Sequence, residues 1–77
     1  MSRDELARAE AELDMVQRHV RQGEGHVARQ RELIEKLLRK RRDVDKAQEL
    51  LVALEATLAL HQDRLQKIYR TKETLTH

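Results

Sequence analysis

Cysteine, proline, phenylalanine and tryptophan are all absent from this chain of 77 residues, which has two glycines and one aromatic ring, that of Tyr69. Without cysteine there is no disulfide framework, zinc finger or thiol nucleophile, so a metal site would need His and carboxylate ligands. No apolar run approaches about 20 residues, the length of a membrane span, and the first residues lead into no signal-type apolar segment. We therefore expect a cytoplasmic protein with no disulfide and no membrane segment.

What the chain does have is charge and aliphatic side chains in similar amounts. Charged residues and hydrophobic residues each make up 39% of it, and Leu, Ile and Val together number 19. This composition is typical of proteins built from long helices, and it has too many aliphatic residues for a disordered polyelectrolyte. The sequence predicts a single all-α domain over residues 1–77.

Two heptad ladders run along the sequence. In the first, apolar residues recur every seven positions from Leu6 to Ile34, with a second set three residues after each, and a similar double ladder begins at Val44. The step from Ile34 to Val44 is ten residues rather than seven, so a turn belongs between the ladders. We predict helices over about 3–40 and 43–73, with the turn at about 41–43.

The two helices are expected to fold back on each other. The first would be about 55 Å long and needs a partner along its length. After a short turn, the nearest partner is the second helix lying antiparallel. The ladders then pair in layers whose residue numbers sum to 81, among them Gly23/Leu58 and Val20/His61. The predicted fold is an antiparallel two-helix coiled-coil hairpin, with the acidic start of the chain beside basic residues at 63–72.

Local signals mark the helix ends and one weak point. A capping box beginning at Ser2 fits the first start, and Asp43 is placed to cap the second helix. The weak point is Gly23-Glu24-Gly25, since each interior glycine costs about 1 kcal/mol relative to alanine. The heptad phase passes through these residues unaltered, which favours a continuous helix over the alternative of three helices.

Apolar residues outside the ladders gather in the half of the hairpin near the turn. Two helices alone bury little apolar surface against the ordering cost of the chain, so a second interface is expected. A homodimer forming a four-helix bundle would cover these side chains, because a bundle needs two apolar stripes per helix. An unidentified protein partner is the alternative occupant. The residues of this predicted dimer face are Leu33, Leu38, Leu50, Val52, Thr57 and Leu60.

Three ladder residues are predicted to fix the register of the hairpin: Gly23, Gln30 and His61. His61 is next to the layer where Gly23 leaves a space, so we expect its imidazole to fill that notch, with a pH-sensitive bundle as the alternative. Gln30 in the seam would set alignment or oligomeric state. His19 and His26 are seven residues apart, about 10 Å along a helix, which is too far to share one ion. No metal site and no cofactor are predicted.

The strongest run of charge is the basic turn, Arg39-Lys40-Arg41-Arg42. It suggests nucleic-acid binding as an alternative function, since basic side chains contact phosphates. That signal is weak, because the formal net charge is only +2 and the single aromatic ring leaves nothing to stack bases. With one serine, no cysteine and no phosphate-binding loop, no enzyme activity is expected. The predicted function is a non-enzymatic structural or protein-interaction module that self-associates.

Two segments, Gly25–Ile34 and Ala47–His61, resemble a group of small uncharacterised helical-hairpin proteins of alphaproteobacteria. In that group a segment of the form GExHxxRQxxLI precedes one of the form AxxLLxxLExTLxxHxxR. The resemblance covers about residues 22–64 and implies a bacterial origin without an activity. This chain departs from the group at Arg41-Arg42-Asp43-Val44, where similar proteins prefer a turn that contains glycine. In architecture alone, a basic hairpin that dimerises is also similar to the Rop-type RNA-binding proteins.

Overall fold

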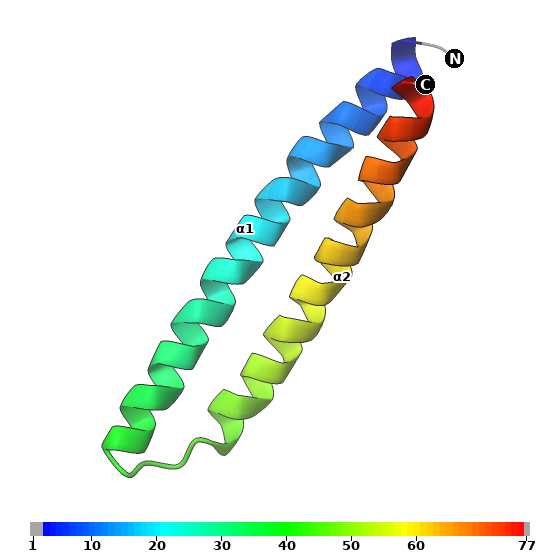
Figure 1. The fold of residues 1–77 in the computed structure, drawn as a ribbon. Coiled ribbons are helices and arrows are strands. Elements are labelled where there is room, and N and C mark those ends of the chain that lie inside the picture. The colour runs from blue at the N-terminus through cyan, green and yellow to red at the C-terminus, as the bar shows by residue number, and fades with distance from the viewer. Residues whose placement is uncertain (1–2, 77) are drawn as a thin grey trace.

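Two long helices make up nearly all of the computed structural model, which describes residues 3–76 (Figure 1). Helix α1 spans Arg3–Arg39 and helix α2 spans Asp45–Thr76. They lie side by side and antiparallel, so that the start of α1 and the end of α2 lie together at one end of a rod measuring 59 × 14 × 14 Å. Over this range there is no strand, and neither helix has an apolar stretch long enough to cross a membrane. The predicted all-α helical hairpin is confirmed.

The two ladders form the seam between the helices, at the heptad positions labelled a and d. Every ladder residue is buried or half-buried, whereas almost all positions between them are exposed. The heptad spacing predicts this interface residue by residue, because positions a and d of a helix point to the same side. The best-covered cluster is formed by Leu13, Val16, Val20 and Ile68, with Leu58 and Leu65 packed against it.

Helix α1 runs without a break through both of its glycines, so the three-helix alternative does not apply. A Cβ atom at Gly23 would lie 3.1 Å from the Cδ1 atom of Leu58 in α2. The missing side chain therefore lets Leu58 approach the α1 backbone closely, and packing across the seam offsets the low helix propensity of glycine. Gly25 is different, because the nearest atoms to a Cβ there would be those of the Arg29 guanidinium, at 3.4 Å.

Helix α1 ends in a turn of the Schellman type. The Arg42 N–H donates to the Leu37 carbonyl at 2.9 Å, and the Arg41 N–H donates to the Leu38 carbonyl at 3.0 Å, which are the paired hydrogen bonds of that motif. Arg41 takes the left-handed conformation, with φ at 53°. Helices most often have glycine at this position. An arginine therefore holds a conformation that glycine adopts at less cost.

Helix α2 begins and ends two to three residues later than predicted, at 45 and 76 rather than at 43 and 73. The Asp43 carboxylate accepts a hydrogen bond from the Asp45 N–H at 3.0 Å, so it caps the helix from just outside it. At the other end the helix continues because Leu75 belongs to the ladder and is half-buried. Ser2 of the predicted capping box lies outside the described residues.

Polar contacts cross the seam on both of its sides. On the side formed by heptad positions e, Arg31 pairs with Glu55 at 3.2 Å, and the Gln17 amide donates to the Tyr69 hydroxyl at 2.8 Å. Both contacts are exposed and link the two helices on this side, which we call the e side.

The opposite side, formed by heptad positions g, is the g side. Here Arg64 of α2 forms an ion pair with Glu12 of α1. This contact places the acidic start of α1 beside the basic end of α2, which is the arrangement that the charge pattern predicts.

Candidate functional site

The residues of the predicted dimer face are exposed in the single chain, Leu60 at 72% and Val52 at 66%. Their heptad positions divide them into two groups. Leu38 and Val52 are at positions e and b, near the turn, and belong to the e side. The others are at positions g and c, together with the small Ala53. We call this second group the apolar flank; it consists of Leu33, Leu50, Ala53, Thr57 and Leu60.

Thr57 is the one polar side chain of the apolar flank. Its hydroxyl donates a hydrogen bond to the Ala53 carbonyl at 3.0 Å, within α2. The donor is therefore satisfied by the helix itself. The apolar flank could be covered by another surface without leaving a hydroxyl proton unpaired.

Helix α2 is much less covered than α1. Among its described residues Ile68 alone is buried, whereas α1 has seven buried residues. The segment Leu50–Leu60 contains a single charged residue, Glu55, and its ladder leucines are only half-buried. A helix that is apolar on all sides is typical of an element covered on all sides. The segment Leu50–Leu60 is apolar on nearly all sides, yet much of its surface is exposed in the single hairpin.

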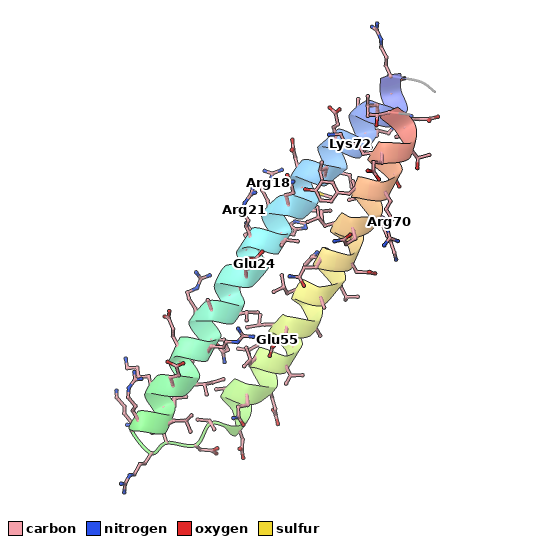
Figure 2. The ribbon with its side chains drawn as sticks, viewed as in Figure 1. Arg18, Arg21, Glu24, Glu55, Arg70 and Lys72 are labelled. Carbon is pink, nitrogen blue, oxygen red and sulfur yellow. The ribbon has the colours of Figure 1, made fainter. Side chains whose placement is uncertain are left out.

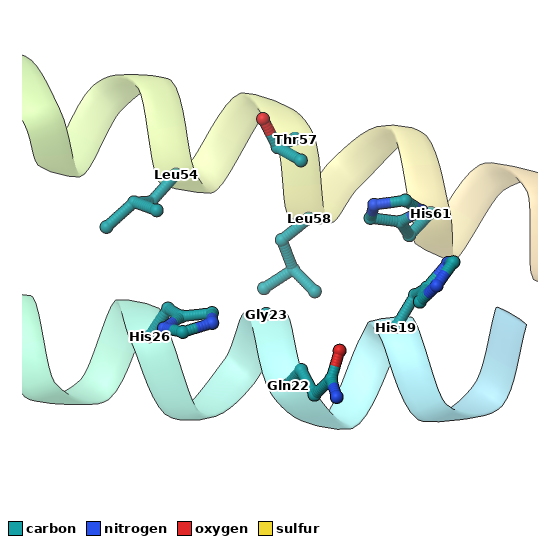
Figure 3. Close-up of a pocket in the computed structure, with 8 residues that line it drawn as sticks. All are labelled: His19, Gln22, Gly23, His26, Leu54, Thr57, Leu58 and His61. Atoms are coloured by element: carbon teal, nitrogen blue, oxygen red, sulfur yellow. The ribbon is translucent and has the colours of Figure 1, made fainter.

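A shallow cavity of about 170 Å³ opens on the g side, near the middle of the rod (Figure 3). Leu58 lies at its centre against Gly23, with His26 to one side and the pair His19 and His61 to the other. The prediction that the His61 imidazole fills the glycine notch was wrong. Leu58 takes that space, because it belongs to the same layer as Gly23 and its side chain points directly at the glycine.

His19 and His61 lie next to each other across the seam. Their ring centroids are 5.0 Å apart and their planes are inclined at 55°. Both residues are half-buried. His26 is instead exposed, and its Nδ1 atom lies 3.1 Å from a guanidinium nitrogen of Arg29 on the same helix. Two imidazoles from different helices therefore share one wall of the cavity, while the third has a different partner.

The His19–His61 pair is the feature that sequence reasoning missed, although a signal for it exists. The layer Val20/His61 places His61 opposite Val20, and His19 is the residue just before Val20 on the g side. The spacing along α1 shows only that His19 and His26 are too far apart to share an ion. It carries no information about residues of the other helix, such as His61. Within residues 3–76, no group of three or more His, Asp or Glu side chains is placed to hold a metal ion.

Gln30 is buried in the seam, with 8% of its surface exposed. Its side-chain amide donates to the Ala47 carbonyl at 2.8 Å, in the first turn of α2. This directional contact ties Gln30 of α1 to the first turn of α2, which is consistent with a register-fixing role.

The basic turn lies at the end of the rod opposite to the start of α1 and the end of α2. All four of its residues, Arg39-Lys40-Arg41-Arg42, are exposed, and Figure 2 shows side chains spreading outward at this end. Asp43 and Asp45 follow directly, so the positive charge there is partly offset.

Comparison of the chain with protein-family models, with curated proteins and with solved structures found no match. The similarity to the hairpin proteins of alphaproteobacteria stays a prediction.

Proposed function

We propose that this chain is a non-enzymatic interaction module that self-associates, two hairpins packing through their apolar flanks into a four-helix bundle. The observation that carries the proposal is the exposure of large apolar side chains along one segment of α2, Leu50–Leu60. Scattered apolar residues are normal on protein surfaces, but a contiguous group on one side marks an interaction site.

A second copy of the chain is the occupant that best fits the apolar flank, because the flank reads the same in both directions along α2. Its residues there are Leu50, Ala53, Thr57 and Leu60, with spacings of three, four and three and the order large, small, small, large. A twofold axis between Ala53 and Thr57 would set Leu50 of one copy beside Leu60 of the other. A twofold interface requires a surface that is complementary to itself in this way.

The small residues at the centre of the flank favour close packing of the two α2 helices, and the leucines supply the apolar area. Full burial of a leucine contributes about 1.5–3 kcal/mol. The three leucines of each copy are 44%, 50% and 72% exposed in the hairpin, about half on average, so roughly 5–10 kcal/mol remains to be gained. Association costs about 4–15 kcal/mol. The two quantities are comparable, and we expect a dimer whose population depends on protein concentration.

Light scattering or sedimentation over a concentration series tests this proposal. The expected mass rises to twice 9.1 kDa. The double variant Leu50→Lys/Leu60→Lys is expected to remain monomeric, because it would bring like charges together across the twofold axis. Gln66→Lys adds a charge at an exposed position of α2 outside the apolar flank and should leave the dimer intact. A folded monomer at every concentration would refute self-association.

A second candidate function is binding of nucleic acid through the basic turn, favoured by the exposure of all four basic residues at one end of the rod. Contacts of this kind neutralise phosphates and release counterions, so retention on RNA or DNA should fall steeply with added salt. Replacing Arg39, Lys40, Arg41 and Arg42 together with Gln should abolish it. Absence of retention even at low salt would exclude this function.

A further inference from the structure

The spacing of the two imidazoles on the g side matches that of two histidines bound to one metal ion. An ion at about 2.0–2.1 Å from each ligating nitrogen, with the two nitrogens at about 90–110° as in tetragonal or tetrahedral coordination, holds the two ring centres about 4.5–5 Å apart. The ring centroids of His19 and His61 are 5.0 Å apart. Figure 3 shows the two rings together between the helices, one contributed by α1 and one by α2.

We propose that His19 and His61 form a two-histidine site for a late first-row divalent metal ion, held between α1 and α2. Imidazole suits Zn²⁺, Ni²⁺ and Cu²⁺, and affinity for a given nitrogen site rises from Ni²⁺ to Cu²⁺. Water completes the coordination, because the pair borders the open cavity on the g side. The ion links the two helices one layer away from the Gly23/Leu58 contact.

Two groups near the pair have partners of their own. Arg64 lies three residues after His61 and is the basic residue of α2 nearest to it in sequence. Its guanidinium is bound by the Glu12 carboxylate, so a negative charge offsets it. The third imidazole of the cavity, that of His26, is engaged with Arg29 and does not belong to the site.

Thermal unfolding of the full chain with each ion tests the site, every variant being compared with itself in the presence of a chelator. An ion that binds only the folded hairpin raises its unfolding midpoint. We expect Cu²⁺, and more weakly Ni²⁺ and Zn²⁺, to raise the midpoint of the unsubstituted chain by about 5 °C or more near neutral pH. His19→Asn and His61→Asn should each abolish the shift.

His26→Asn is the matched control, since it removes an imidazole that lines the same cavity and should leave the metal-induced shift unchanged. The site lies within one hairpin, so the shift should persist in the monomeric Leu50→Lys/Leu60→Lys variant. This separates failure of the metal site from failure of self-association.

Two outcomes would overturn the proposal. One is the absence of any metal-induced shift in the unsubstituted chain. The other is a shift of equal size in the His19→Asn, His61→Asn and His26→Asn variants, which would mean that the ion binds elsewhere. Isothermal titration with Cu²⁺ gives a second readout, for which we expect one ion per chain in the unsubstituted protein and in His26→Asn only.

Discussion

Gly23 and Leu58 lie so close that a Cβ atom on the glycine would be 3.1 Å from the leucine Cδ1 atom. This closeness predicts that Gly23→Val destabilises the hairpin by about 1–3 kcal/mol, because the branched side chain would push Leu58 out of the seam. The free energy of unfolding in urea measures the effect. Gly25→Val is the control, since only the flexible end of Arg29 is near. It should be neutral or slightly stabilising, given the low helix propensity of glycine. Equal losses from both substitutions would contradict this account.

The left-handed conformation of Arg41 predicts a stabilising substitution. Arg41→Gly should raise the free energy of unfolding by about 0.5–1 kcal/mol, because glycine adopts positive φ without a steric penalty and this gain exceeds its greater freedom in the unfolded chain. Arg42→Gly removes the same charge at a position without positive φ and should give no gain. Thermal unfolding of the two variants side by side measures the difference. A larger gain from Arg42→Gly would show that charge, rather than backbone conformation, limits the turn.

The hydrogen bond from Gln30 to the Ala47 carbonyl predicts a cost for shortening this side chain. Gln30→Ala should lower the free energy of unfolding by roughly 2 kcal/mol, through the lost hydrogen bond and the space left in the seam. Gln22→Ala makes the same change at an exposed position of α1 and should cost less than about 0.5 kcal/mol. The comparison uses urea unfolding under identical conditions. Similar costs at both positions would mean that Gln30 acts only through helix propensity.

The ion pair between Glu12 and Arg64 predicts a small coupling that depends on salt. A double-mutant cycle with Glu12→Gln and Arg64→Gln should give about 0.2–1 kcal/mol at low ionic strength, because both groups are partly solvated. The coupling should shrink at high salt, where exposed charges are screened. A coupling above 2 kcal/mol, or one unaffected by salt, would show that the pair is more than a surface contact.

Most of the fold could be predicted from the sequence because heptad spacing is a local signal with a geometric meaning. Leu13 and Ile68 lie far apart in the chain, yet their positions in the two ladders predict that they share a layer, and both are buried. The change of phase between Ile34 and Val44 likewise predicts the turn. The exact length of the turn was less predictable, because Asp43 can cap the second helix either as its first residue or from a position before it begins.

The candidate site was less predictable, since it depends on which side chain reaches a given space. The predicted layer Gly23/Leu58 is present in the structure. The space beside Gly23, however, is filled by Leu58 and not by His61 as predicted. Heptad positions specify which residues face each other and leave side-chain direction open. The contact between His19 and His61 is of the same kind, because it joins a g position to a d position of the other helix.

The antiparallel arrangement has a practical consequence for any reporter attached to this protein. Arg3 and Thr76 emerge at the same pole of the rod, while Arg41 is at the other pole, along a molecule 59 Å in length. A fluorophore attached at Arg3 or Thr76 is therefore held away from the positively charged tip. Donor and acceptor dyes at Arg3 and Thr76 would report opening of the hairpin without disturbing either the leucines or the imidazoles midway along it.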